Sequence, residues 1–340
     1  MTPLHTLRDD AVEAVVGTLY ANHPALMQRF GQRGRTACRG DIHYHLDYLE
    51  GALAAEEAGL FTDYACWLKE ILTTRGVPVT HLTESFSLLN AFLSARLPEP
   101  DALRAAAVLK AGCDAIVLDG LPSPYLHARV PSLPSALRYG EVALTGNQQA
   151  AQELMGEAMQ AGHTLVEASV RLIQPAMYDL GRRWQANQIT VAQEHLATAV
   201  TQNVLARAYM QAEFAPPGGR TALFAAVEGN HHNLGLRMLA DAFETTGWGV
   251  GYLGADVPLQ DLIRHVDTHP ADLLCLSLSL PGHLTMARDT MGRLKAELGN
   301  RCPSIMVGGQ VTLVGDRVWR SLKADGWAAD ALHAMEQVAA

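Results

Sequence analysis

Apolar residues in the first third of the chain follow a helical spacing. Leu46, Leu49 and Leu53 recur at intervals of three and four residues, which places them on one face of a helix. The stretch 121–134 is rich in proline and serine and has the composition of a connector. We therefore expect a helical N-terminal domain over residues 1–134.

A second region of helical spacing runs from about residue 145 to residue 211, with a break at 182–188. After that break, Thr190 and Gln193 have the spacing of a capping box, in which each residue satisfies the backbone of the other at a helix start. The pattern predicts a bundle of about four helices as a domain over residues 140–213.

After residue 219 the pattern changes to short apolar runs that alternate with helical segments. Strands are expected over residues 221–227, 250–253, 273–280 and 304–307, and helices over 234–244, 259–266 and 283–298. Strands and helices that alternate in this way form a doubly wound parallel sheet, so a Rossmann-like domain is expected over 219–340. Ligands of such sheets bind beyond the carboxyl ends of the strands.

The composition fits a globular chain of about two domains. The 340 residues carry 26 Lys and Arg against 35 Asp and Glu, a net charge of −9, and 49% are hydrophobic. This acidic balance, with no basic recognition helix in the first third, predicts no nucleic-acid partner. Five cysteines without a CxxC pair, no signal peptide and no apolar run of membrane-spanning length predict a cytoplasmic protein with no membrane partner.

Polar residues and glycines gather where the predicted strands end. They are Asn230, His232 and Gly235 after the first strand, Ser277 and Ser279 in the third, and Gly308 and Gly309 after the fourth. Forty-one residues (236–276) precede the serine element, and 27 (281–307) separate it from the two glycines. The set resembles the cobalamin-binding domain of methionine synthases, mutases and corrinoid proteins, whose signature is an acid-x-His-x-x-Gly loop, a serine-led strand and Gly-Gly.

This resemblance implies a role for each element. His232 would be the lower axial ligand of cobalt, replacing the nucleotide base of the cofactor. Ser277 would hydrogen-bond that displaced base, and Gly308 and Gly309 would leave room for it. A histidine at a helix start is otherwise often a capping or solvated residue, and His231 is a second candidate for the same role.

The chain departs from the family pattern twice. Asn230 stands where the family has an acid, so the carboxylate that makes a ligating imidazole more basic is missing. The serine element, Ser277-Leu-Ser-Leu280, is one residue longer to its leucine. The first departure weakens a methyl-transfer role and leaves cobalamin binding unaffected.

Within the predicted bundle, nine residues separate Trp184 from the pair Glu194-His195. This arrangement resembles the bundle of CarH-type adenosylcobalamin photoreceptors. The resemblance implies that Trp184 caps the upper axial face, that Glu194 and His195 border the adenosyl group, and that His195 can become a cobalt ligand after photolysis. The alternative is a packing tryptophan and a surface Glu-His pair.

The N-terminal region contains arginines followed by histidines and an aromatic residue. We single out Arg29, Arg33, His43, His45 and Tyr48, which we place in a loop over residues 29–48. A helical region without DNA-binding features before a cobalamin photoreceptor module is similar to the photocobilins, which hold biliverdin. Arginines suit its propionates, and aromatic and histidine side chains suit its pyrroles.

Three alternatives stay open for this region. It could be a helical dimerisation or effector-docking domain with a solvated arginine loop. His43 and His45 could form a metal pair, although residues two apart on a helix face away from each other. Cys38 or Cys66 could bind a bilin covalently, but noncovalent binding is the expected mode.

Taken together, the sequence predicts a photoreceptor and not an enzyme. Adenosylcobalamin and biliverdin are the expected cofactors, and light-driven cleavage of the cobalt–carbon bond would change domain packing or oligomeric state. The expected partners are further copies of the chain, in a homo-oligomer, and a separate effector protein. The main alternative is a corrinoid carrier protein of a methyltransferase system, and a third is a cobalamin storage or chaperone module.

Overall fold

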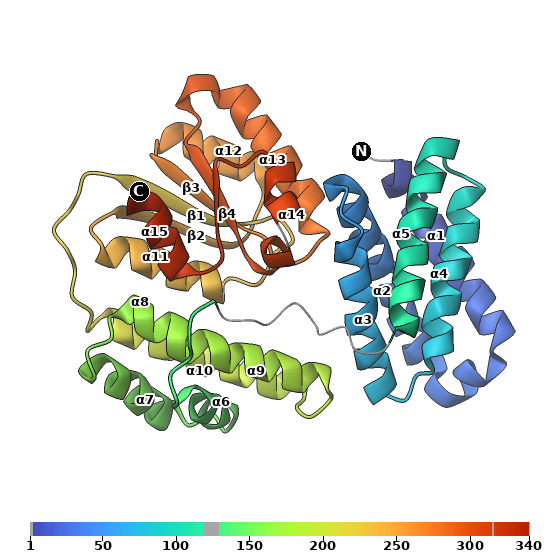
Figure 1. Cartoon of the computed structure of the whole chain (residues 1–340), viewed down its shortest axis with the longest axis horizontal. Coiled ribbons are helices and arrows are strands. Elements are labelled where there is room, and N and C mark those ends of the chain that lie inside the picture. Colours follow the sequence, from blue (N-terminus) through green and yellow to red (C-terminus); the bar gives the residue numbers. More distant parts are fainter. Residues whose placement is uncertain (1–2, 119–128, 315, 340) are drawn as a thin grey trace. The chain divides into compact units, whose positions relative to one another are not determined.

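The computed structural model describes residues 3–118, 129–314 and 316–339 (Figure 1). The chain divides into two compact units, Met1–Ser123 and Pro124–Ala340. Most of the expected connector, up to residue 128, lies outside the described residues. Within the described ranges, no helix is both long and apolar enough to cross a lipid bilayer.

The first unit is helical, as the apolar spacing predicted. Its described elements are α1 (Pro3–Asn22), α2 (Pro24–Ala55), α3 (Gly59–Thr74), α4 (Val79–Ser94) and α5 (Glu99–Val117). The expected arginine loop over residues 29–48 is wrong, because this stretch belongs to α2. The helix is kinked at Gly31, whose φ of 59° suits glycine, and continues because the apolar face with Ile42, Leu46 and Leu49 is buried.

The second unit begins with a group of helices. They are α6 (Ala136–Leu144), α7 (Gln148–Gln160), the continuous segment α8 (Leu165–Ala168), η2 (Ser169–Ile173) and α9 (Gln174–Gln185), and then α10 (Val191–Tyr209). The helix α6 lies before residue 145, the position at which the helical spacing of this region was expected to begin. The capping box at the start of α10 is confirmed: the Thr190 side chain accepts from the Gln193 backbone N–H, and the Gln193 side chain accepts from that of Thr190.

A five-stranded parallel sheet follows and confirms the doubly wound fold. Its strands are β1 (Thr221–Val227), β2 (Gly249–Val257), β3 (Leu273–Ser277), β4 (Ser304–Gly308) and β5 (Gly326–Ala328), in the spatial order β2-β1-β3-β4-β5. The order reverses beside β1, the kind of switch point at which such sheets bind ligands. The strand β5 was not predicted, because three residues give too short a pattern, and β3 ends three residues before the expected 280.

Helices cover both faces of this sheet (Figure 1). The elements are α11 (Leu234–Thr245), α12 (Leu259–Thr268), α13 (His283–Leu298), η3 (Gly299–Arg301), η4 (Gln310–Val314), α14 (Asp316–Ser321) and α15 (Ala331–Ala339). The helices α11 and α15 pack together on one face, and α12 and α13 pack together on the other.

The bundle core continues onto the outer side of α11 and α15. Met238, Ala242 and Ala331 belong to the same buried cluster as the bundle side chains. This packing joins the bundle and the sheet within one unit, so the start of α10 has a defined position relative to the strand ends.

Candidate functional site

Asn230 anchors the loop between β1 and α11. Its side chain is fully buried; its amide nitrogen donates to the Ser277 carbonyl oxygen at 2.9 Å, and its amide oxygen accepts from the His232 backbone N–H at 3.1 Å. A carboxylate can only accept, so an ionised aspartate could not make the first of these bonds. The asparagine that departs from the family pattern thus ties the histidine loop to the end of β3.

Two carboxylates hold the same loop from the side of β2. Asp256 accepts from the Gly229 backbone N–H at 2.7 Å, and Glu228 accepts from the Leu259 N–H at 3.2 Å at the start of α12. Glu228 is therefore engaged at the start of α12.

His232 has the properties of a nitrogen ligand. Its side chain is exposed, yet desolvation by the surrounding protein lowers the pKa of the imidazole, and the nearby charge of Glu194 partly opposes that shift. A lowered pKa keeps the ring neutral near neutral pH, the form that binds a metal ion. The influence of Glu194 also shows that the first turn of α10 lies within electrostatic reach of the loop.

Gly308 and Gly309 allow close contact between backbone segments, whereas Gly235 borders open space. A Cβ on Gly309, whose φ is +109°, would lie 2.1 Å from the Leu278 carbonyl oxygen, and one on Gly308 would lie 2.9 Å from the Ala328 carbonyl oxygen. Both glycines therefore let neighbouring backbone segments approach closely. A Cβ on Gly235 would meet no described atom within 4 Å, so open space lies beside the first turn of α11. The exposed neutral imidazole and this open turn fit a corrinoid.

Sequence reasoning missed His283, the first residue of α13. Its Nδ1 accepts from the backbone N–H groups of Ser279 at 3.2 Å and Leu280 at 3.1 Å. The Gly229 backbone acts to raise the pKa of the imidazole. Burial outweighs this and lowers the pKa to about 4, so the ring is neutral. A histidine just after the serine element was the feature of the sequence that could have pointed to this residue.

The residues expected above the cofactor lie on α9 and α10. Trp184, in the last turn of α9, is partly buried and packs on the bundle core. Glu194 accepts from the Thr198 hydroxyl at 2.9 Å, and its other oxygen lies 2.7 Å from His195 Nδ1. The His195 side chain is 74% exposed, and this pairing directs its Nε2 atom away from the carboxylate.

The bilin candidates differ in accessibility. Arg29 and Arg33 are exposed, with the Arg29 guanidinium 4.8 Å from the centre of the Phe30 ring, and His43 is partly buried. These three side chains lie on the kinked helix α2, not in a loop.

His45 and Tyr48 lie in the core of the helical unit. His45 Nδ1 is 2.7 Å from the Tyr64 hydroxyl, and Nε2 is 3.1 Å from the Ser85 hydroxyl, which itself donates to a backbone carbonyl. Tyr48 stacks on Tyr64 with 3.8 Å between ring centres. Burial lowers the pKa of His45 to about 3, and both of its ring nitrogens have partners within this unit.

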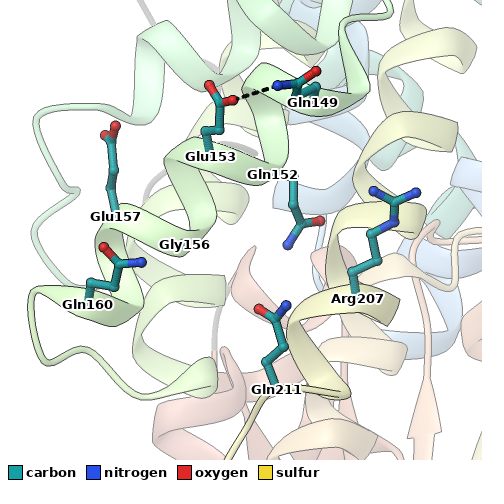
Figure 2. A pocket seen from close by; sticks show the side chains of 8 residues that line it. All are labelled: Gln149, Gln152, Glu153, Gly156, Glu157, Gln160, Arg207 and Gln211. Atoms are coloured by element: carbon teal, nitrogen blue, oxygen red, sulfur yellow. Dashed lines mark hydrogen bonds between the residues drawn. The ribbon is translucent and has the colours of Figure 1, made fainter.

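A polar groove of about 440 Å³ lies elsewhere, on the surface of the bundle (Figure 2). It is lined by residues of α7 and by Arg207 and Gln211 near the end of α10, and Gln149 donates to Glu153 at 3.0 Å on its rim. None of the expected site residues lines it, so we do not assign it to the cofactor.

Comparison with known proteins identifies two regions of the chain as cobalamin-binding domains. Residues 220–336 match a family model described as a B12 binding domain, and residues 138–209 match a second model with the same description. The two matches coincide with the sheet and with the helical group before it. The chain therefore has a cobalamin cofactor.

Two curated relatives and one solved structure are similar to parts of the chain. The HTH-type transcriptional repressor CarH of Myxococcus xanthus is 34% identical over 145 residues, 42% of this chain and 47% of that protein. The dimethylamine corrinoid protein 3 of Methanosarcina acetivorans is 31% identical over 83 residues, 24% of this chain and 39% of that protein. The chain thus spans less than half the length of either relative.

The monomethylamine corrinoid protein of Methanosarcina barkeri shares the fold. Its structure superposes with a TM-score of 0.53 at 21% identity, over 60% of this chain and 96% of that one.

Proposed function

Because the chain is a CarH-like cobalamin-binding protein, we propose that it is a light sensor whose bundle and sheet together enclose adenosylcobalamin. The observation that carries this proposal is the buried core that the bundle shares with the sheet helices α11 and α15. This packing joins α10, which carries the pair expected above the corrin, to the sheet, whose β1 loop carries the imidazole expected below it.

Adenosylcobalamin supplies a cobalt–carbon bond that visible light breaks. His232 would hold the cobalt, and its loop is fixed by Asn230 and by the carboxylate of Asp256. The cofactor's displaced nucleotide tail would enter beside Gly235, where the first turn of α11 is open. Ser277, at the end of β3, and Ser279 are the residues proposed to contact it.

His195 is the residue that would respond to loss of the upper ligand. Its Nδ1 atom pairs with Glu194, which sets the ring orientation and leaves Nε2 as the ligating atom. We propose that His195 would bind cobalt once the adenosyl group is lost, and that Trp184 would cover this side of the cofactor before that loss.

The packing between bundle and sheet is the proposed two-state element. Arg237 of α11 lies over the rings of Tyr209, at the end of α10, and Tyr252 of β2, at 5.4 and 5.1 Å. Movement of α10 would change these contacts and those of Met238 and Ala242. The resulting change in domain packing or oligomeric state is the proposed signal to a separate effector protein.

Biliverdin is the proposed second chromophore, bound by the helical unit. Arg29, Arg33 and His43 have accessible positions on α2 and would receive its propionates and pyrrole nitrogens. His45 and Tyr48 would contribute to the wall behind them, since their side chains are buried. Protein purified from cells supplied with biliverdin should show a far-red absorption band beyond that of the corrin.

The experiment that tests light sensing uses the full chain loaded with adenosylcobalamin in the dark. Illumination should change the absorbance spectrum irreversibly and alter the size measured by gel filtration. The His195→Ala variant should photolyse but give a different final spectrum. Unchanged size and a reversible or absent spectral change in the wild type would contradict the proposal.

A corrinoid carrier is the second candidate, favoured by the similarity to dimethylamine corrinoid protein 3. Loading with methylcobalamin and adding a methyl-acceptor system separates the two functions. Demethylation by a partner enzyme with no effect of light on assembly would establish the carrier.

A further inference from the structure

Residues 129–134, which we call the strap, form neither a helix nor a strand and lie directly before the bundle. Arg129, at the start of the strap, pairs with two carboxylates of the sheet domain. Its Nε donates to Asp330 Oδ2 and its Nη2 to Glu336 Oε1, each at 3.2 Å. Glu336 lies on α15 and Asp330 directly before it, so this end of the strap is fixed to the sheet.

The other end of the strap is fixed to the bundle. The Leu133 backbone N–H donates to the Arg171 carbonyl oxygen at 2.8 Å. Arg171 lies in the π-helical turn η2, where the regular ladder of helix hydrogen bonds is interrupted. The side chains of Val130 and Leu133 pack against the core that the bundle shares with α11 and α15. The strap therefore contacts the bundle and the sheet at the place where the two pack together.

The pair between Arg129 and Asp330 differs from an exposed ion pair. The Asp330 side chain is only 2% exposed, and its Oδ1 accepts from the His333 backbone N–H at 2.8 Å at the start of α15. A carboxylate this buried needs a counter-charge, and Arg129 supplies it. The Glu336 carboxylate is exposed, so the second pair contributes little. The contact with Asp330 is thus the one that holds the start of the strap on the sheet.

We propose that the strap is a latch, which the pair between Arg129 and Asp330 keeps closed and which opens when the bundle moves relative to the sheet. This inference rests on the proposed light-driven change in packing. Because Leu133 is attached to the bundle and Asp330 belongs to the sheet domain, such movement pulls the strap between its two fixed points. Release of Arg129 would add residues 129–134 to the expected connector and so lengthen the tether to the helical unit.

Trypsin measures the state of the latch directly. This protease cleaves after an arginine whose side chain enters its specificity pocket, so Arg129 must leave both carboxylates before the bond to Val130 is cut. Where opening is fast relative to cleavage, the cleavage rate follows the open fraction. The experiment is a brief digestion of the full chain, loaded with adenosylcobalamin in the dark, with mass spectrometry to give the rate at this bond.

Two substitutions change the latch and keep the cleavage site. Asp330→Asn removes the buried charge but keeps an amide oxygen that can accept from the His333 N–H. We expect it to speed cleavage after Arg129 by about tenfold. Glu336→Gln removes only the exposed pair, so its rate should lie within about threefold of the wild type. Equal rates in Asp330→Asn and the wild type would overturn the latch.

A third variant leaves Asp330 in place. Arg129→Lys keeps the charge and a trypsin site, but an ammonium group lacks the planar fork that reaches two carboxylates. Its cleavage rate, divided by that of a free peptide with the same sequence, should exceed the corresponding wild-type ratio. If Asp330→Asn is cut faster at every bond, that variant is unfolded, and equal ratios for Arg129→Lys and the wild type would then overturn the latch.

An arginine on the other face of the sheet provides a matched control. Arg301 of η3 forms an ion pair with Asp267 of α12. The Asp267→Asn variant therefore makes the same chemical change as Asp330→Asn at a site outside the strap. Its cleavage rate after Arg129 should lie within about twofold of the wild type. Cleavage there as fast as in Asp330→Asn would overturn the latch, because the effect would then be a general loosening.

Illumination connects the latch to the change in packing. We expect light to raise the rate of cleavage after Arg129 by at least about threefold in the loaded wild type, and by less in Asp330→Asn, where the latch is already open. If light changes the size of the wild type in gel filtration but not this rate, only the latch is overturned. If light changes neither, the proposed light sensing is contradicted as well.

Discussion

Two histidines, His232 and His45, show how differently the two units of the chain use the same side chain. His232 stands on a loop whose backbone is held by Asn230, and its imidazole is exposed and neutral. His45 lies in a helical core, with Tyr64 and Ser85 occupying both ring nitrogens. The loop therefore exposes its histidine, as the proposed ligand must be, whereas the helical unit uses its histidine for internal structure.

The difference shows which kind of sequence signal is informative about chemistry. His232 was singled out by its spacing to Gly235 and to the serine and glycine elements, and such spacing reflects how strand ends meet in space. His45 was singled out because arginines and aromatic residues stand near it in the sequence. In a helix, neighbours in sequence point in different directions, so closeness in the sequence did not show that the His45 side chain turns into the core.

The largest effect is expected from Gly309→Ala in the sheet. The new methyl group would lie 2.1 Å from the Leu278 carbonyl oxygen, in backbone with a positive φ. We expect a loss of about 3 kcal/mol or more in the free energy of unfolding, measured with urea. Gly235→Ala is the control, because open space surrounds its Cβ position; it should change stability by less than about 1 kcal/mol. Equal stability of the two variants would show that the strand ends do not pack this closely.

A pH dependence of stability is expected from the helical unit. Because the folded pKa of His45 is about 3 and the unfolded value is about 6.5, the unfolded chain binds the extra proton first as pH falls. The stabilisation is complete above pH 6.5 or so and is lost towards pH 3, amounting to about 2 kcal/mol by pH 5.

The measurement is urea unfolding of the wild type and His45→Gln at pH 7 and pH 5. The variant should lose about 2 kcal/mol less than the wild type between these pH values. An identical loss in both proteins would mean that His45 is not the buried neutral group described above.

The last effect concerns the loop itself. Asn230→Asp keeps the acceptor for the His232 amide but places a carboxylate against the Ser277 carbonyl. We expect a loss of about 1–3 kcal/mol in stability and weaker hydroxocobalamin binding, measured by unfolding and titration. Tighter binding in this variant would instead show that the acid of the family pattern acts on the imidazole here as well.

Much of the sheet could be predicted from the sequence because its strands are short apolar runs between clear helices. The strand β1 and the helix α13 have the predicted limits. The short edge strand β5 could not be found, since three residues carry no periodic pattern. The kinked helix α2 was mistaken in part for a loop. Gly31 and Gly34 stand among its arginines, and only packing shows that the chain continues as a helix.

Likewise, only part of the candidate site could be predicted from the sequence. Spacing identified Asn230, His232 and Ser277, but the hydrogen bonds of Asn230 depend on how β1 and β3 lie side by side, which no local pattern contains. His283 belongs to no motif, so only the structure shows that it accepts from the amides of Ser279 and Leu280. The close approach of two backbone segments at Gly309 likewise depends on tertiary packing, which no local pattern in the sequence contains.

The most direct test of the account is a titration of adenosylcobalamin, in the dark, into the wild type and His232→Ala. We predict that the substitution weakens binding by more than about 100-fold and removes the absorbance change that marks histidine ligation, because a direct ligand should matter more than its outer partners. Equal affinity and an unchanged spectrum in His232→Ala would contradict the assignment of this imidazole to cobalt.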